Sequence, residues 1–291
     1  MARTLAQPAT LAVTRARRWK IDWHAVTAHA ILVAAVALLA FPLYYAFVIS
    51  TQTLSQVTTM PPRPWPSTAI VANYVEAWQR AQMGRMLINS AIVALSVAVG
   101  KIAISLLSAF AIVYFDFRGK QVVFWMIFVT LMLPVPVRIV STYQVMSVLG
   151  WVNTYWGLTV PLMASATGTF LFRQFFRTIP DSLAEAAQLD GAGPMRFLWT
   201  ILLPLSKANM AALFVILFVY GWNDYLWPLM ITNTPNMRTA VIGIETLVPR
   251  TSQLPEWNVA MAAAMMVLLP PVAVIVAMQR WFVKGLIETE K

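Results

Sequence analysis

The sequence predicts an all-α integral membrane protein with six transmembrane helices, and three observations support that fold class. First, only 11% of the 291 residues are charged and 59% are hydrophobic, whereas soluble domains carry about a quarter charged residues. Second, the apolar residues gather in six blocks, each close to the ~20 residues that cross a bilayer as a helix. Third, these blocks are continuously apolar, whereas the strands of a transmembrane β-barrel alternate polar and apolar residues.

The six predicted spans are residues 28–49, 87–114, 121–140, 155–172, 208–231 and 259–283. Residues 115–120 separate the second span from the third and contain a glycine and three charges, which predicts a tight helical hairpin. The connection 50–86 carries four prolines near its start, which predicts an irregular loop there. The domain prediction is a basic N-terminal segment 1–27, a transmembrane permease domain 28–283 and a tail 284–291.

The basic residues predict the orientation of the spans. The net charge is +10, but the lysines and arginines lie between apolar blocks and form no basic-aromatic stripe, so nucleic-acid binding is not expected. With the N-terminus inside, fourteen of the 21 Lys and Arg lie on inner segments, six lie on outer segments, and Lys101 lies within a span. This asymmetry predicts that both termini are cytoplasmic. The first block is too long for a cleaved signal peptide and is read as a retained anchor.

Several classes of site are absent from the sequence. It contains no cysteine, which excludes disulfides, thiolate metal sites and a cysteine nucleophile. We find no cluster with metal-ligand spacing, and no converging polar groups of the kind that a membrane-embedded enzyme needs. An ion-coupled secondary carrier is a second functional class, and it would favour carboxylates within the spans and internal repeats.

The most informative stretch is residues 181–204, in the inner loop between the fourth and fifth spans. Asp181 or Ser182 is expected to cap a helix that begins near Leu183 and carries Glu185 in its first turn. Gly191, together with the glycine at position 193, is expected to end that helix. A second amphipathic stretch follows up to residue 204. A short helix-turn-helix of this kind suits insertion into a groove of a partner protein.

This stretch resembles the EAA loop of the permease subunits of ABC importers, whose pattern is Glu-Ala-Ala, a following Gly and then Ile-x-Leu-Pro. The matching residues are Glu185, Ala186, Ala187, Gly191, Ile201, Leu203 and Pro204, and Asp190 is similar to the carbohydrate-uptake, MalG-like branch. The resemblance implies the MetI-like fold of type I ABC importer permeases, placed in a bacterial inner membrane. It also implies that the loop forms a cytoplasmic coupling helix that docks on an ATPase subunit.

The same resemblance implies the partners: a second permease subunit, an ATPase homodimer, an extracytoplasmic substrate-binding protein and the membrane lipid. The chain lacks a Gly-x-x-x-x-Gly-Lys-Ser/Thr phosphate loop, so we expect a non-catalytic subunit without a cofactor, with ATP and Mg bound in the ATPase. The stretches 130–138, 161–176, 220–228 and 279–286 resemble the family's permeases for sn-glycerol 3-phosphate. This implies that substrate, with related glycerophosphodiesters as further candidates; a neutral sugar or oligosaccharide is the alternative.

Charged residues within spans are costly and usually face a cavity. The candidate pathway residues are Lys101, Arg138, Trp222, Asn223 and Asp224. Arg138 follows two prolines near the outer end of the third span, and we expect it to guide a phosphate group. Lys101 is expected to add to the positive electrostatic field along the pathway. Other roles stay open: Arg138 can snorkel to the interface, Lys101 can pair with Asp224, and Asn223 with Asp224 can contact the second permease.

Overall fold

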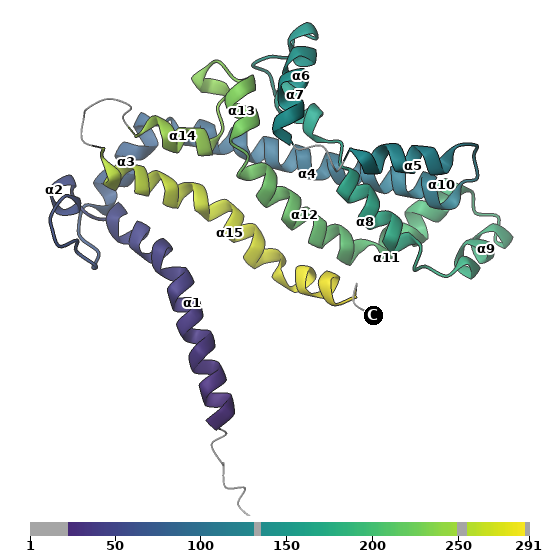
Figure 1. Ribbon diagram of the computed structural model, residues 1–291, viewed down its shortest axis with the longest axis horizontal. Helices are drawn as coiled ribbons and strands as arrows, with labels where there is room; N and C mark the ends of the chain where they lie inside the picture. The colour runs from purple at the N-terminus through teal and green to yellow at the C-terminus, as the bar shows by residue number, and fades with distance from the viewer. Residues whose placement is uncertain (1–22, 131–134, 249–254, 289–291) are drawn as a thin grey trace, which may run out of the picture. The chain divides into compact units, whose positions relative to one another are not determined.

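The computed structural model describes residues 23–130, 135–248 and 255–288, and these ranges form helices and connecting loops without strands (Figure 1). In chain order the elements are α1 (Trp23–Ser50), α2 (Leu54–Val57), α3 (Ile70–Arg80), α4 (Met83–Tyr114), α5 (Lys120–Val129), α6 (Val135–Val148), α7 (Tyr155–Thr159), η1 (Val160–Leu162), α8 (Ala166–Phe176), α9 (Asp181–Leu189), α10 (Pro194–Phe197), η2 (Leu198–Leu202), α11 (Leu203–Leu205), α12 (Lys207–Trp222), α13 (Leu226–Ile231), η3 (Pro235–Met237), α14 (Ala240–Thr246) and α15 (Trp257–Glu288).

The chain divides into two compact units, Met1–Tyr45 and Ala46–Lys291. The described part of the first unit is the stretch of α1 from Trp23 onward, and its apolar side chains are exposed, with Leu38 75% and Leu39 77% accessible. A helix that is apolar on every face needs lipid or another protein around it. The predicted first span is therefore a single long apolar helix.

Three long helices of the second unit, α4, α12 and α15, lie side by side with α12 in the middle (Figure 1), and α8 packs on α4. Small residues allow the close approaches. A Cβ atom added to Gly221 of α12 would lie 3.3 Å from the Cα atom of Ala94 in α4, and one added to Gly168 of α8 would lie 2.5 Å from the Ser105 hydroxyl in α4. Such contacts hold membrane helices together, because van der Waals packing replaces the hydrophobic effect there.

The described residues contain three helices long and apolar enough to cross a membrane, which are α1, α4 and α15. The count rises to four if Pro194–Leu205 and Lys207–Trp222, which meet at 73°, form one broken span. The number six therefore stays a prediction.

The predicted third, fourth and fifth spans are divided in the structure. The third becomes α5 and α6, and residues 131–134 between them, with the first of the two expected prolines, lie outside the described residues. The fourth becomes α7, η1 and α8, where Pro161 lies in η1 and the Ser165 hydroxyl caps α8. The fifth stops at Trp222 and resumes as α13. Proline and side-chain caps interrupt helices without lowering the hydrophobicity that marks a block.

The irregular loop after residue 50 is confirmed, and so is the turn at 115–120, but α5 packs against α8 rather than pairing with α4 as a hairpin. The chain leaves α4 at Phe115 and turns at Gly119, whose φ is +86°, while Lys120 pairs with Asp116 at 3.0 Å. Residues 58–69, which hold the four prolines, are irregular. The loop 50–86 also contains the helices α2 and α3, which were not predicted. Most of the predicted terminal segment 1–27 lies outside the described residues, and α15 extends into the predicted tail.

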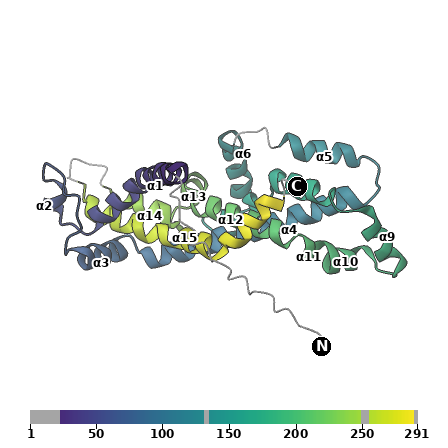
Figure 2. The same cartoon turned by 90° about the horizontal axis from the view of Figure 1, so that it is seen from below.

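Within the second unit, α2 and α3 lie at one end and α9 and α10 at the other (Figures 1 and 2). At the α3 end, the buried Asn73 side chain donates to the carbonyl oxygens of Ser50 at 2.9 Å and Gln52 at 2.8 Å. Arg80 pairs with Glu256 at the start of α15, and this hydrogen bond raises the pKa of Arg80 above its ordinary value. These contacts tie α3 to both α1 and α15.

Candidate functional site

The first helix of the predicted coupling loop is α9, and its start differs from the prediction. It begins at Asp181, with Pro180 at the N-cap position and no side-chain cap. Asp181 and Ser182 therefore do not cap a helix that begins at Leu183. Asp181 instead lies in the first turn, where its negative charge suits the positive helix end. Glu185 lies one turn further along than predicted, in the second turn.

The end of α9 follows the prediction at Gly191. Its φ is +73°, its N–H donates to the carbonyl of Gln188 at 3.0 Å, and the N–H of Ala192 donates to the carbonyl of Ala187 at 2.8 Å. This pair of bonds is a Schellman motif, which needs a left-handed residue at the position after the C-cap. Gly193 has φ of −69° and is the N-cap of α10, so it starts the second helix rather than ending the first.

The EAA residues divide between two faces of α9. Ala187 points inward and is 5% exposed, so the small side chain lets α9 lie close against the core. Glu185, Ala186 and Asp190 are exposed. Leu189 is 90% exposed beside them, and the loop exposes further large apolar side chains at Met195, Trp199 and Leu205. An exposed apolar surface with charged neighbours is typical of a protein interaction site.

The Ile-x-Leu-Pro part of the motif lies where the helix changes direction. Leu203 donates its N–H to Leu198, five residues back, which makes residues 198–202 a π-helical turn. Pro204 follows and has no N–H to donate. Ser206, which is fully buried and donates its hydroxyl to the carbonyl of Leu202 at 2.6 Å, separates the two arms that meet at 73°. A π-turn and a proline are established causes of sharp helix kinks.

An aromatic cluster anchors the coupling loop to the long helices. The buried ring of Phe197 packs edge-on against Tyr114 of α4, with ring centres 5.2 Å apart. Tyr114 also packs against Phe176 of α8 at 6.0 Å. Because Tyr114 and Phe176 lie at the ends of α4 and α8, a force on the loop reaches both helices through packed rings.

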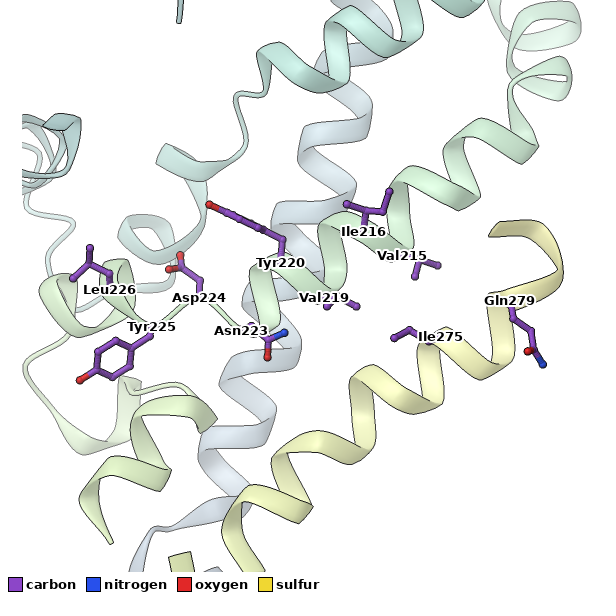
Figure 3. Close-up of a pocket in the computed structure, with 10 residues that line it drawn as sticks. All are labelled: Val215, Ile216, Val219, Tyr220, Asn223, Asp224, Tyr225, Leu226, Ile275 and Gln279. Atoms are coloured by element: carbon purple, nitrogen blue, oxygen red, sulfur yellow. The ribbon is translucent and has the colours of Figure 1, made fainter. Parts of the chain in front are cut away.

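The second candidate region is a cavity of about 840 Å³ beside the end of α12 (Figure 3). Its lining residues come from α12, the turn after it, α13 and α15, and they are Val215, Ile216, Val219, Tyr220, Asn223, Asp224, Tyr225, Leu226, Ile275 and Gln279. Asn223 and Asp224 were predicted. Tyr220, Tyr225 and Gln279 were missed, although residues 216, 219, 220 and 223 recur at the spacing of one helix face.

Trp222 does not line this cavity. Its side chain is 2% exposed, its indole N–H donates to the carbonyl of Val267 at 3.0 Å, and its ring stacks on Phe218 at 5.7 Å. It therefore packs α12 against α15. The two residues that follow Trp222 face the cavity, whereas Trp222 helps to hold in place the helix that carries them.

The predicted charged residues lie in one neighbourhood. Lys101 of α4 is half-buried, and its Nζ atom lies 5.1 Å from the centre of the Tyr220 ring. Asp224 and Arg138 are both near enough to Lys101 to interact with it electrostatically. The Asp224 carboxylate also lies near the backbone N–H groups of Leu226 and Trp227. Arg138 is exposed on α6. Neither Lys101 nor Arg138 is among the residues that line the cavity, but the Lys101 ammonium lies beside Tyr220, which is.

Residues 101–288 match the family described as "Binding-protein-dependent transport system inner membrane component". The chain belongs to this family and is a multi-pass subunit of the inner membrane. It is similar to the sn-glycerol-3-phosphate transport system permease protein UgpE of Agrobacterium fabrum, with 54% identity over 91% of this chain and 97% of the relative. The UgpE proteins of Brucella melitensis and Yersinia enterocolitica are 54% and 52% identical, each over 90% of this chain and 96% of theirs.

Two solved structures share the fold. One is a bacterial ABC transporter involved in the import of the acidic polysaccharide alginate, with a TM-score of 0.79 at 20% identity over 89% of this chain and 96% of that chain. The other is a bacterial alginate ABC transporter in complex with an alginate pentasaccharide-bound periplasmic protein, with a TM-score of 0.62 at 15% identity over 90% and 96%. The predicted fold class, an ABC importer permease, is confirmed.

Proposed function

We propose that this chain is one permease subunit of an ATP-binding-cassette importer for sn-glycerol 3-phosphate, and that it forms half of the translocation pore. The observation that carries the substrate assignment is the 54% identity, over 91% of the chain, to a permease named for that solute. An alignment of that extent takes in most of the chain, including its coupling loop. Related glycerophosphodiesters are further candidate substrates, since they carry the same glycerol and phosphoryl groups.

The proposed complex also contains a second permease, an ATPase homodimer and an extracytoplasmic binding protein. The alginate transporter with a periplasmic protein bound supports a partner of the last kind. ATP and Mg would be held by the ATPase. Cytoplasmic termini would place α9 and α10 inside and α3 outside, which requires these elements to lie at opposite ends of the second unit, as they do (Figure 1).

The exposed side of α9, with Glu185, Ala186 and Asp190 beside the protruding Leu189, is the proposed docking surface for the ATPase. A short helix with an exposed apolar anchor is recognised by insertion into a groove. The buried side, with Ala187, and the aromatic contact of Phe197 with Tyr114 would carry the motion of the ATPase to α4. Ile201, Leu203 and Pro204 would direct it into α12.

The cavity beside α12 is proposed as part of the solute pathway. A phosphoryl group needs cationic partners, which Lys101 and Arg138 supply. Asn223 and Asp224 offer hydrogen-bond groups for the glycerol hydroxyls. A neutral sugar or oligosaccharide is the second candidate, because the exposed ring of Tyr220 and that of Tyr225 provide aromatic surface for a sugar.

The proposed function is tested by the ATPase activity of the complete complex in proteoliposomes. We expect stimulation by binding protein loaded with sn-glycerol 3-phosphate and little by the unloaded protein. Stimulation only by binding protein loaded with a neutral sugar would leave the family assignment intact and contradict the substrate assignment. If no ATPase associates with the permease pair, the assigned role of the α9 surface is wrong.

The coupling role is tested by two glycine substitutions that differ only in backbone conformation. A Cβ atom at Gly191 or Gly193 would meet no atom within 4 Å, but φ is +73° at Gly191 and −69° at Gly193. A left-handed alanine costs about 1–2 kcal/mol, so Gly191→Ala is expected to weaken binding of the ATPase by roughly five- to thirtyfold. Gly193→Ala is the matched control and should bind nearly as the wild type does. Titration of the permease pair with ATPase measures both, and equal effects would contradict the assigned role of the Schellman turn.

A further inference from the structure

Tyr220 is the residue of the cavity that contacts Lys101 directly. The Lys101 Nζ atom lies 5.1 Å from the centre of the Tyr220 ring, which is within the range of a cation–π contact. Tyr220 lines the cavity and is 57% exposed, so the Lys101 ammonium lies directly beside a residue of the cavity wall, although Lys101 is not itself among the lining residues. The contact joins α4 to α12, and the close approach of these helices at Ala94 and Gly221 makes it possible.

The direction of the lysine side chain supports this contact. Side chains of an α-helix lean toward its N-terminus, so Lys101 reaches back toward the level where Ala94 meets Gly221. Tyr220, next to Gly221 in sequence, lies at that level. The four-carbon stem of Lys101 is half-buried between the helices, while the ammonium reaches a ring that opens on the cavity.

Asp224 supplies the negative charge that this position needs. In Figure 3 its carboxylate and the Tyr220 phenol project from the end of α12 toward the same side. The carboxylate lies near the backbone N–H groups of Trp227 and Leu226, in the turn that leads into α13. A charged lysine within a span is costly, and an aromatic face together with a nearby carboxylate offsets that cost.

These partners nevertheless do not occupy the N–H donors of the Lys101 ammonium. Lys101 forms no ion pair within 4 Å of a carboxylate and donates no hydrogen bond to the part of the chain that the structure describes. An ammonium has three N–H donors, and a ring face does not saturate them. A solute that carries an anionic oxygen can therefore accept hydrogen bonds from Lys101 while the ring keeps the ammonium in place.

We propose that Tyr220 is a positioning residue that holds the Lys101 ammonium beside the cavity wall, and that Asp224 is the counter-charge which a phosphoryl solute replaces as it passes. The set Lys101, Tyr220 and Asp224 thereby selects anionic solutes over neutral ones. This inference rests on the proposed function, since it deepens the assignment of the cavity to the pathway of a phosphorylated solute.

The absence of cysteine from the chain makes a charge-rescue experiment possible. Uptake of sn-glycerol 3-phosphate is measured in proteoliposomes that contain the complete complex with Lys101→Cys. We expect uptake to fall at least about tenfold, because hydrogen bonds to a charged group are lost. Treatment with aminoethyl methanethiosulfonate forms a mixed disulfide, releases methanesulfinate and restores an ammonium, so uptake should recover. The neutral methyl reagent should not restore it. The wild-type chain controls for effects of the reagents on the partner proteins.

The role of Tyr220 is tested in the same background. Recovery by the aminoethyl reagent should fall about threefold or more with Tyr220→Leu, which removes the ring, and should persist with Tyr220→Phe, which keeps it. Ile104→Cys in a Lys101→Gln chain is the matched control, because an ammonium attached one helical turn away should give no recovery. Equal recovery with the aminoethyl and methyl reagents, or full recovery with Tyr220→Leu, would overturn the proposal.

Two further measurements separate the possible failures. Binding-protein-stimulated ATPase activity reports an assembled complex in every variant. If the wild-type complex imports no sn-glycerol 3-phosphate, the proposed function fails and this inference fails with it. If the wild type imports the solute but recovery does not depend on charge or on the ring, only the inference fails.

Asp224→Asn should lower KM and the maximal uptake rate together, and unchanged values of both would remove Asp224 from the set.

Discussion

Gly157→Ala is expected to destabilise the second unit by about 3 kcal/mol or more, at the upper end of the range for overpacked sites. A Cβ atom at this position would lie 2.2 Å from the backbone oxygen of Trp151 and 3.3 Å from the side chain of Ile231. The oxygen belongs to the backbone and cannot move aside as a flexible side chain can. The carbonyl of Gly157 also accepts the indole N–H of the buried Trp227 at 3.0 Å, so a shift of α7 would break that bond.

The midpoint of thermal unfolding of the purified complex, followed by tryptophan fluorescence, measures this effect. Gly193→Ala introduces the same methyl group into open space at an ordinary φ, and it should leave the midpoint nearly unchanged. A Gly157→Ala complex as stable as this control would show that α7 can move away from Trp151 at little cost.

Asn89→Leu is the second substitution for which we expect a large loss, again more than about 3 kcal/mol. The Asn89 side chain is fully buried and makes three hydrogen bonds. Its amide donates to the carbonyls of Asn236 at 2.8 Å and Arg238 at 2.9 Å, and its oxygen accepts the Tyr155 hydroxyl at 2.7 Å. Leucine fills a similar volume but leaves the Arg238 carbonyl and the Tyr155 hydroxyl without this partner, each costing about 1–3 kcal/mol if it stays buried. The Asn236 carbonyl loses one of two donors, since it also accepts the Arg85 Nε–H at 3.2 Å.

A graded series separates the hydrogen bonds from packing. Tyr155→Phe removes one of the three bonds and should cost about 1 kcal/mol. Asn236→Leu changes an exposed side chain and leaves its carbonyl in place, so it controls for the introduction of leucine. Unfolding midpoints that decrease in the order Asn236→Leu, Tyr155→Phe, Asn89→Leu are expected. If the Asn89→Leu and Tyr155→Phe complexes have the same unfolding midpoint, water replaces the lost hydrogen bonds.

Hydrophobicity alone predicts the long helices well and their interruptions poorly. The predicted spans 87–114 and 259–283 correspond to α4 and α15 within a few residues. The block 155–172 is as apolar as a span, but Thr154 caps α7 at its start and Ser165 caps α8 within it, so the block divides at Ser165. These caps depend on single hydroxyl groups, which a window average of hydrophobicity does not register.

The sequence also does not reveal which faces of the long helices point inward. In a membrane protein both the packed face and the lipid-facing side are apolar, so no periodic pattern distinguishes them. Adjacency in the sequence suggests one role for Trp222, Asn223 and Asp224. In the structure the Trp222 ring is buried, whereas Asn223 and Asp224 line the cavity. The glycine at 191 was predictable because a left-handed C-terminal turn needs a specific residue type, whereas the tyrosine at 220 acts through a contact with another helix.

The kink at Ser206 determines how the second unit can move. The arm that contains the coupling motif meets α12 at 73°, and one fully buried residue separates them. When two helical arms meet at a large angle, a displacement along the axis of the first arm moves the second arm mainly sideways. A small stroke delivered to residues 194–205 would therefore swing α12 across its neighbours rather than slide it along its axis. Swinging, and not sliding, changes the width of a passage that runs beside the helix.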